Sequence, residues 1–244
     1  MERRDRAPVA TFFLEEIAGP TATLQPGAAH HAAVKRLAVG DSVRLTDGRG
    51  TLATGVVSRM AKRELIVAVE RADRVPAPPS IEVLPPVADR ERMLWLAEKC
   101  TELGVATWRP VLFARSRSVA ARGEGATFAH KVRARMVAAL EQSSGAWLPV
   151  VHHEAPLAEA VAATSAPARY VLHQAGGPMT CDGAAGAALI FGPEGGIEPS
   201  EFALLDAAGW KAVAISHTTL RFETAGVAGV AIVRAASVAR HSGE

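Results

Sequence analysis

The feature that most constrains the fold is a change of residue pattern at the proline-rich segment 74–80, Arg-Val-Pro-Ala-Pro-Pro-Ser. Proline fixes φ and removes a backbone donor, so this segment interrupts any regular element. Before it, short β-type runs separated by turn signals such as Asp47-Gly48 are typical of a small barrel or sandwich. The runs are Thr11–Ile17, Thr21–Leu24, Ser42–Thr46, Thr51–Ser58 and Glu64–Val69, with a short helix expected within His30–Leu37. We therefore expect one domain over residues 1–75.

After this linker, apolar strand patterns alternate with helical ones, which favours an α/β domain over residues 76–244. The first helix has Met93, Leu96, Ala97 and Cys100 on one face and a glycine, Gly104, at its end. The expected strands are Ile81–Leu84, Ala106–Leu112, Tyr170–His173, Leu189–Phe191 and Lys211–Ile215, and the expected helices are Arg90–Leu103, Phe128–Gln142, Pro199–Ala208 and Thr224–Ala239.

Composition limits the class of protein. A chain of 244 residues with 49% hydrophobic residues can bury a core for two domains. The charged N-terminus is followed by no apolar leader segment, so we expect a cytoplasmic protein. Cys100 and Cys181 form no disulfide framework and are expected to be small buried hydrophobes. The pairs His30-His31 and His152-His153 lack further ligands at metal-binding spacing, so no metal is expected.

The last expected helix is apolar on most faces. Its uncharged run between Glu223 and Arg234 is too short to span a bilayer, so we expect no membrane association. Gly226 and Gly229 allow another backbone to approach closely. The helix therefore packs either in the core or against another subunit, and the sequence does not separate these alternatives.

Charge is distributed unevenly along the chain. Residues 1–75 hold 12 Lys and Arg against 9 Asp and Glu, a net +3, whereas residues 76–244 hold 15 against 16, a net −1. The basic first part indicates a polyanionic partner such as a nucleic acid.

Two loops near the C-terminal end carry the functional signal. The turn Phe191-Gly-Pro-Glu-Gly-Gly-Ile197 follows a buried run, and its glycines expose backbone groups that can meet a polar ligand edge. It lacks the Lys-Ser/Thr of a phosphate loop and the glycine spacing of a dinucleotide site, which disfavours a triphosphate or NAD. The polar segment Ile215–Thr224 also follows a strand and opens a helix. Together the two loops predict one ligand pocket.

The order and spacing of several motifs resemble one family, the RsmE methyltransferases. These motifs are Phe191–Ile197, Leu220–Ala225, Glu98–Val105 (Glu-Lys-Cys-Thr-Glu-Leu-Gly-Val), Glu141-Gln-Ser143 and, in the first part, His31–Asp41 with Asp47-Gly48. The resemblance implies a SPOUT-type α/β domain with a C-terminal trefoil knot, a PUA-like RNA-binding β-barrel, a homodimer formed through the SPOUT domain, and S-adenosylmethionine as methyl donor. The implied reaction is methylation of N3 of a uridine in 16S ribosomal RNA of the small subunit.

The resemblance also implies a cofactor pocket in the knot, made mostly of backbone groups and apolar contacts. Its residues would be Leu172, His173, Phe191, Gly192, Pro193, Gly195, Gly196, Ile197, Ile215, Ser216, Leu220, Thr224 and Ala225.

Three charged residues are candidates for the chemistry. A fixed guanidinium at Arg221 would stabilise negative charge on the uracil as N3 loses its proton. Glu223 would orient Arg221 or act as base, and Glu194 is the other carboxylate within reach of the pocket. The plainer alternatives are a solvated surface charge for Arg221 and a helix-start carboxylate, favoured by the helix dipole, for Glu223.

The chain departs from the family pattern at several positions. Ile215-Ser216 replaces a common Leu-Gly, Thr218 stands where arginine is frequent, Asp89 stands where lysine is frequent, and Ser144-Gly145-Ala-Trp147 replaces the usual Gly-Arg. Serine can replace the glycine only if its φ stays negative or strain is tolerated. RNA contacts would then fall to other cations, namely Lys35, Arg36, Arg49, Arg115, Arg117 and Arg122. Trp147 is a candidate for stacking on a base.

Two other functions remain open from the sequence. One is a related knotted enzyme that methylates a ribose 2′-hydroxyl or a different base, against which the barrel and the Glu98–Val105 motif argue. The other is a non-catalytic RNA-binding or ribosome-assembly protein that keeps the fold, which the departures at Ser216 and Thr218 make conceivable.

Overall fold

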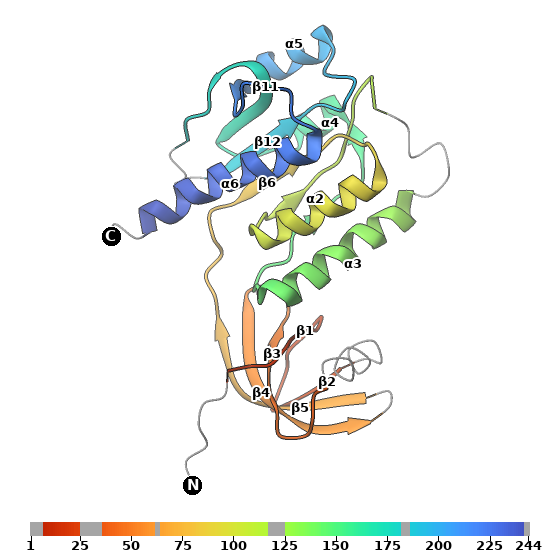
Figure 1. Cartoon of the computed structure of the whole chain (residues 1–244), viewed down its shortest axis with the longest axis vertical. Helices are drawn as coiled ribbons and strands as arrows, with labels where there is room; N and C mark the ends of the chain where they lie inside the picture. The colour runs from red at the N-terminus through yellow and green to blue at the C-terminus, as the bar shows by residue number, and fades with distance from the viewer. Residues whose placement is uncertain (1–6, 25–35, 62–63, 117–124, 182–185, 242–244) are drawn as a thin grey trace. The chain divides into compact units, whose positions relative to one another are not determined.

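The computed structural model describes residues 7–24, 36–61, 64–116, 125–181 and 186–241 (Figure 1). These residues fall into two compact units. The first unit lies within residues 1–77 and 137–148, and the second lies within residues 78–136 and 149–244. The segment 137–148, which follows the proline-rich linker by many residues, thus belongs with the N-terminal unit.

The first unit is built on a five-stranded sheet in the order β1-β3-β4-β5-β2. Its strands are β1 (Thr11–Phe13), β2 (Thr21–Leu24), β3 (Ser42–Thr46), β4 (Thr51–Ala61) and β5 (Glu64–Arg74). All pairings are antiparallel except that of β1 with β3. Alternate residues such as Phe12, Val43, Leu45, Leu65 and Val67 fill one core. The five expected strands are present, although β1 is shorter and β4 and β5 are longer than the sequence pattern predicts.

The segment 137–148 completes this unit through backbone contacts. The Phe13 N–H donates to Glu141 Oε1 at 2.8 Å, and the Thr46 hydroxyl donates to the Gly145 carbonyl at 2.9 Å. The indole of Trp147 packs on Gly50 and donates to the Pro76 carbonyl at 3.3 Å. The Glu141–Ser143 motif and Trp147 therefore have structural contacts within the barrel unit. The helix expected within His30–Leu37 lies outside the described residues up to position 35.

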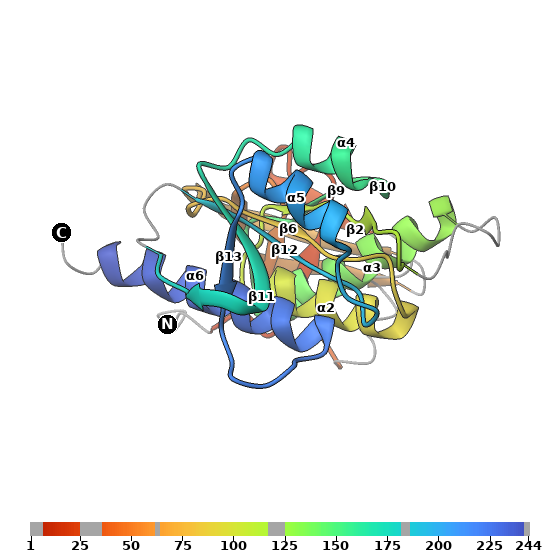
Figure 2. The same ribbon diagram turned by 90° about the horizontal axis from the view of Figure 1, so that it is seen from above.

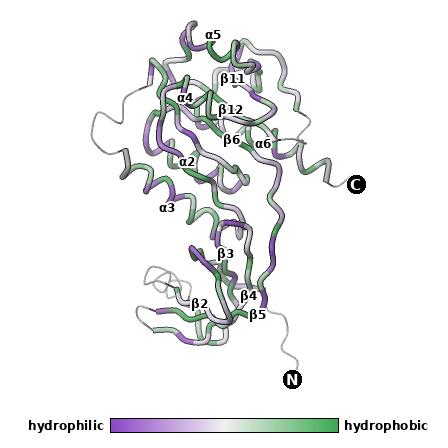
Figure 3. Tube along the Cα trace, turned by 180° about the vertical axis from the view of Figure 1, so that it is seen from behind, coloured by the Kyte–Doolittle hydropathy of each residue, from purple (hydrophilic) through white to green (hydrophobic). Residues whose placement is uncertain are grey.

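The second unit has a six-stranded parallel sheet in the order β13-β11-β12-β6-β7-β9. These strands are β6 (Ile81–Leu84), β7 (Thr107–Trp108), β9 (Val150–Val151), β11 (Ala168–Pro178), β12 (Ala187–Phe191) and β13 (Lys211–Ala214). All five residues of β12 are buried, as a central parallel strand covered on both faces requires, and Figure 3 shows the whole strand as hydrophobic.

Helices cover both faces of this sheet, so the unit has three layers (Figure 2). Helices α2 (Arg90–Glu102) and α6 (Phe222–His241) pack together on one face. Helices α4 (Leu157–Ala162) and α5 (Pro199–Ala207) lie on the other, where they share a core with the inner strands. Helix α3 (Gly125–Ser143) contributes its first part to this unit and its last part to the barrel unit.

The expected strand Ala106–Leu112 is wrong as a single element. It divides into β7 and β8 (Val111–Leu112), which pair with different partners, because Pro110 has no N–H to donate to a ladder. The sequence also missed β9, β10 (Ala155–Pro156) and α4, which are too short to carry a periodic pattern.

Helix α6 is long and apolar enough, by length and composition, to cross a membrane, a property that core helices of soluble proteins share. It packs on α2, β12 and β6. A Cβ added at Gly226 would lie 2.7 Å from Phe191 Cζ, and one added at Gly229 would lie 2.7 Å from Leu172 Cδ1. The expected approach of another backbone is wrong: the atoms packed against these two glycines belong to the side chains of Phe191, Leu96 and Leu172.

The two cysteines differ. Cys100 is buried in α2 as expected, and burial raises the pKa of its thiol, so the group is an inert apolar side chain. Cys181 is only half-buried, so the expectation that both are core residues is wrong for this one.

Candidate functional site

A cavity of about 370 Å³ opens in the second unit, beside the middle of β11 and the carboxyl ends of β12 and β13. In parallel α/β sheets this edge is where ligands bind. Three chain segments form its walls: residues 172–174 in the middle of β11, the turn after β12, and the loop from β13 into α6. The lining residues are Leu172, His173, Gln174, Phe191, Gly192, Pro193, Glu194, Gly196, Ile197, Ile215, Ser216, Thr218, Thr219, Leu220, Arg221, Phe222 and Ala225.

The glycine turn 192–196 is tight, and its three glycines leave only Pro193 and Glu194 to present side chains. Gly196 has φ +79°, and its N–H donates to the Pro193 carbonyl at 2.8 Å. A Cβ added at Gly192 would lie 2.6 Å from Ile197 Cγ1, so only glycine leaves this wall as it is.

Arg115 braces the turn from outside. Its Nη1 donates to the Gly195 carbonyl at 2.8 Å, and its Nε lies 3.4 Å from Glu198 Oε1. The Glu201 carboxylate accepts from the N–H groups of Ala114 and Glu198, at 2.8 and 2.9 Å. The neighbouring loop and the start of α5 are thereby joined, and these contacts fix the shape of the turn.

The loop before α6 is ordered by its hydroxyl groups. Ser216 Oγ accepts from the Thr218 N–H at 3.1 Å and lies 3.0 Å from Thr218 Oγ1, while Thr219 donates to Gln174 Oε1 at 2.9 Å. Among the described non-glycine residues, positive φ occurs only at Arg36 and Ser144. Ser216 therefore replaces the family's glycine without left-handed strain.

The three candidate catalytic residues lie around this cavity. Arg221 and Glu194 line it and are exposed, whereas Glu223, in the first turn of α6, stands behind the lining with its side chain 13% exposed. Arg92 of α2 contacts both carboxylates: its Nη1 donates to Glu194 Oε1, and its Nε lies 3.8 Å from Glu223 Oε1. Within the described part of the chain, the buried Glu223 Oε2 has no hydrogen-bond partner.

Of the thirteen expected cofactor residues, the cavity gathers all except Gly195, which faces Arg115, and Thr224, which is exposed on α6. Thr218 and Thr219, within the expected pocket segment 215–220, also line it; Gln174 and Phe222 line it and were not expected, although each lies beside a residue that was. Arg92 was missed because its two partners lie far away in the sequence, and a charged residue in the first turn of a helix gives no signal of such contacts.

The expected RNA-contacting cations are scattered. Lys35, Arg117 and Arg122 lie outside the described residues. Arg36 and Arg49 are in the first unit, where Arg49 is 72% exposed and lies 3.8 Å from Glu15. Arg115 is in the second unit and, as described, holds the glycine turn.

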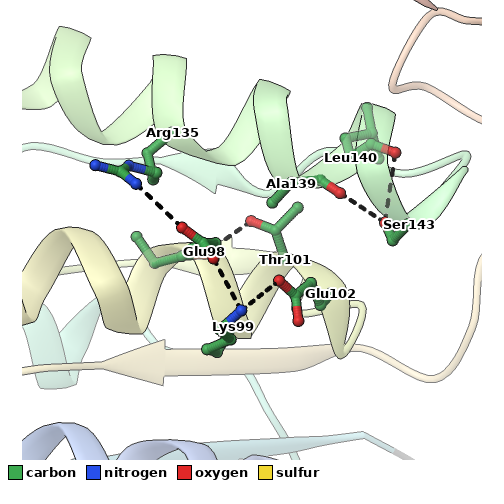
Figure 4. A network of polar contacts seen from close by, with 9 residues as sticks. Glu98, Lys99, Thr101, Glu102, Arg135, Ala139, Leu140 and Ser143 are labelled. Atoms are coloured by element: carbon green, nitrogen blue, oxygen red, sulfur yellow. Dashed lines mark hydrogen bonds and ion pairs between the residues drawn. The ribbon is translucent and has the colours of Figure 1, made fainter. Parts of the chain in front are cut away.

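The Glu98–Val105 motif forms the end of α2 rather than a wall of the cavity. Lys99 Nζ donates to Glu98 at 2.8 Å and to Glu102 at 2.7 Å, and Arg135 of α3 donates to Glu98 at 3.2 Å (Figure 4). Gly104 has φ +71°, a value that ends the helix and that other residues rarely adopt. The motif is therefore structural.

Comparisons with known proteins agree with this architecture. A family described as "RNA methyltransferase domain" matches residues 76–234, and one described as "RNA methyltransferase PUA domain" matches residues 24–70. The ribosomal RNA small subunit methyltransferases E of Mycobacterium bovis and Mycobacterium tuberculosis are each 34% identical to this chain over 211 residues, which is 80% of this chain and 79% of each relative.

Solved structures show the same fold. A protein of Legionella pneumophila solved with bound S-adenosylmethionine has a TM-score of 0.86 and 24% identity, over 95% of this chain and 98% of that one. The ribosomal RNA small subunit methyltransferase E of Neisseria gonorrhoeae, also solved with S-adenosylmethionine, has a TM-score of 0.83 and 24% identity, over 93% and 97%.

The chain is thus an RNA methyltransferase with an N-terminal PUA domain and a C-terminal α/β methyltransferase domain. More narrowly, it belongs to the RsmE family of S-adenosylmethionine-dependent ribosomal RNA methyltransferases, so the resemblance drawn from the motifs is confirmed. The trefoil knot stays a prediction.

The cavity residues fit this cofactor. Leu172, Phe191, Ile197 and Leu220 supply apolar walls, and the turn at Gly192 leaves room that a Cβ would fill. An adenine ring needs such walls together with backbone donors and acceptors along its polar edge.

Proposed function

We propose that this enzyme methylates N3 of a uridine in 16S ribosomal RNA of the small subunit, with S-adenosylmethionine held in the cavity between the glycine turn and the loop before α6. One observation carries the proposal most directly. Residues from both loops, including Gly192, Ile197, Leu220 and Arg221, line one cavity of about 370 Å³, a size suited to a small-molecule ligand.

The cofactor supplies an electrophilic methyl group on a sulfonium centre. The protein holds this group and the uracil in line, and such positioning provides much of the rate. The apolar residues Leu172, Phe191 and Ile197 exclude water around the adenine. The backbone of the turn 192–196 and of residues 215–220 meets its polar edge. The proposed cofactor site is completed by other residues that line the same cavity, namely His173, Pro193, Gly196, Ser216 and Ala225.

Arg221 is the proposed stabiliser of the uracil anion. Its guanidinium stands at the cavity edge, exposed to an incoming base, and it makes no hydrogen bond or ion pair with the described residues. As N3 loses its proton, negative charge spreads to the neighbouring uracil oxygens, where a guanidinium donates two parallel hydrogen bonds.

The carboxylates of Glu194 and Glu223 occupy different positions at the site. Glu194 lines the cavity, while Glu223 stands behind Arg221 at the start of α6. A buried carboxylate oxygen without a donor costs about 1–3 kcal/mol, and Glu223 Oε2 is such an atom among the described residues. We infer that the substrate, or Arg221 after a change of rotamer, supplies this donor when RNA binds.

The barrel unit is the proposed RNA anchor. Arg36 and Arg49 belong to it, with Lys35 beside them in the sequence, and exposed cations position nucleic acids through their phosphates. Arg115, Arg117 and Arg122 are the proposed contacts in the second unit. The enzyme acts in the cytoplasm on the small subunit or its precursor.

The proposed dimer forms through the SPOUT domain. Helix α6 is uncharged between Glu223 and Arg234, yet its apolar residues Ile232 and Val238 are 37% and 58% exposed in the single chain. A second copy would remove this surface from water. Sedimentation should show a dimer, and charged substitutions at Val238 should shift the equilibrium toward a monomer.

The experiment for the reaction uses a deletion strain. Mass spectrometry of nucleosides from its 16S RNA should lack one 3-methyluridine, which the wild-type gene restores and the Arg221→Ala variant does not. Loss of a 2′-O-methylnucleoside instead would support the related knotted enzyme. An unchanged RNA, together with no calorimetric binding of S-adenosylmethionine, would support the non-catalytic protein and reject the proposal.

A further inference from the structure

We propose that Arg92 is a positioning residue for the methyl transfer: its guanidinium links the glycine turn to the loop carrying Arg221 by holding Glu194 and Glu223 together. The inference rests on the proposed function, because it assigns Arg92 a part in aligning the same site. Arg92 itself is not among the residues that line the cavity.

The local sequence fixes the position of the Arg92 backbone in the first turn of α2. Asp89 caps the start of α2, and its Oδ1 accepts from the Arg92 N–H at 3.1 Å. Met93 and Leu96 then anchor the helix in the core with less than 2% exposure. The backbone of Arg92 is therefore rigid, and its side chain is only 32% exposed although it belongs to a long, charged residue.

The contacts of Arg92 join three segments that are distant in the sequence. Its Nη1 donates to Glu194 Oε1 in the glycine turn, and its Nε faces Glu223 Oε1 at 3.8 Å in the first turn of α6. Two carboxylates gathered at one place repel each other, and a planar guanidinium between them removes the repulsion and fixes their separation. A lysine, as a point charge, does this less well.

The contacts of Arg92 affect the positions of the groups proposed to react. Phe222, which is buried, separates Glu223 from Arg221, so a shift of Glu223 moves the start of α6 and with it the guanidinium at the cavity edge. At the other end, Glu194 lies in the turn that forms the proposed cofactor wall. Arg92 thus sets the distance between the methyl donor and the stabiliser of the uracil anion.

Loss of Arg92 should therefore lower the turnover much more than the affinity for S-adenosylmethionine. Without Arg92 the cavity keeps all its lining residues, so S-adenosylmethionine should bind with an affinity within about threefold of wild type, which is about 0.7 kcal/mol. The turnover should fall about 10²-fold, since a displacement of about 1 Å between reacting groups costs that much.

The test compares Arg92→Gln, Arg92→Lys and Arg92→Ala in the full-length enzyme. Single-turnover methylation of 16S RNA gives the rate, and calorimetry gives the cofactor affinity. We expect Arg92→Lys to keep more activity than Arg92→Gln. We also expect millimolar guanidinium to restore part of the rate of Arg92→Ala, because the free ion can occupy the place of the side chain between the carboxylates.

Arg135→Gln is the matched control, because it removes another arginine–glutamate pair, with Glu98 at 3.2 Å, away from the cavity. It should leave the rate unchanged. Wild-type rates for Arg92→Gln would overturn the inference, as would an Arg92→Ala variant with a lowered melting temperature and no response to guanidinium. If the wild-type enzyme itself methylates no RNA, the proposed function fails instead, so the two failures are distinguishable.

Discussion

The hydroxyl oxygens of Thr11 and Ser144 lie 2.9 Å apart within the barrel unit, and Ser144 has φ +55°. The family commonly has glycine at this position, because glycine adopts positive φ at little cost. Serine pays about 1–2 kcal/mol for that conformation. The hydrogen bond to Thr11 offsets part of this cost, which explains how the chain tolerates the departure at 144.

Substitution of Ser144 should separate strain from hydrogen bonding. Ser144→Gly removes both the strain and the bond, so the free energy of unfolding should change by less than about 1 kcal/mol. Ser144→Val keeps the strain, adds a β-branch and loses the bond, so it should destabilise by about 2–3 kcal/mol. Scanning calorimetry of both variants measures the difference, and equal melting temperatures would contradict this account.

The glycine turn makes a second prediction. Gly192→Ala places a Cβ 2.6 Å from Ile197 Cγ1, so Ile197 must shift within the cavity wall. We expect S-adenosylmethionine to bind about tenfold more weakly, in line with the 1–3 kcal/mol that overpacking costs. Gly177→Ala is the control, because an added Cβ there meets nothing within 4 Å. Calorimetric titration should show wild-type affinity for the control, and a similar loss in both variants would refute the steric explanation.

The sequence predicted elements with a clear apolar run or helical period better than elements without one. Buried runs such as Ile81–Leu84 and the periodic helix Arg90–Glu102 appear within one residue of their expected bounds. Helix α4 and strands β9 and β10 went unnoticed, because two to six residues cannot show a period and their structure depends on neighbours distant in the chain. The sequence also gave no sign that residues 137–148 belong to the barrel unit, because that too depends on contacts with residues distant in the chain.

Some features of the candidate site could be predicted from the sequence and others could not. The glycine turn and the loop before α6 are local signals, so the sequence could point to both. Arg92 could not be found, since its contacts with Glu194 and Glu223 exist only in three dimensions. The geometry of Ser216 was equally out of reach, because a residue type does not determine its own φ.

The Glu98 network predicts a pH dependence. The hydrogen bond from Lys99 lowers the pKa of the Glu98 carboxyl below its usual value; partial burial opposes this shift, and Arg135 adds to it. A group whose folded-state pKa is lowered stabilises the fold above its unfolded value, about 4.3 for glutamate, and loses that contribution as the pH falls through the folded value.

Glu98→Gln should therefore lower the free energy of unfolding by about 0.5–1 kcal/mol at neutral pH. The gap from wild type should narrow as the pH falls below about 4. Urea unfolding of both proteins over a pH series measures this. A gap that widens in acid would mean that the carboxylate does not stabilise the fold through its charge.

The last prediction is that Arg234 stabilises the fold and has no part in catalysis. Its guanidinium, half-buried on α6, donates to the carbonyls of Leu103, Gly104 and Pro79 at 3.0, 2.7 and 3.1 Å. These hydrogen bonds satisfy the backbone carbonyls that follow the last turn of α2. Arg234→Met should lower the free energy of unfolding by about 2–4 kcal/mol, because buried carbonyls lose a charged donor. Arg221→Met, at the exposed cavity edge, should keep the melting temperature and lose methylation. At a temperature where Arg234→Met stays folded, its cofactor affinity should match wild type, and a loss of affinity there would assign Arg234 to the site instead.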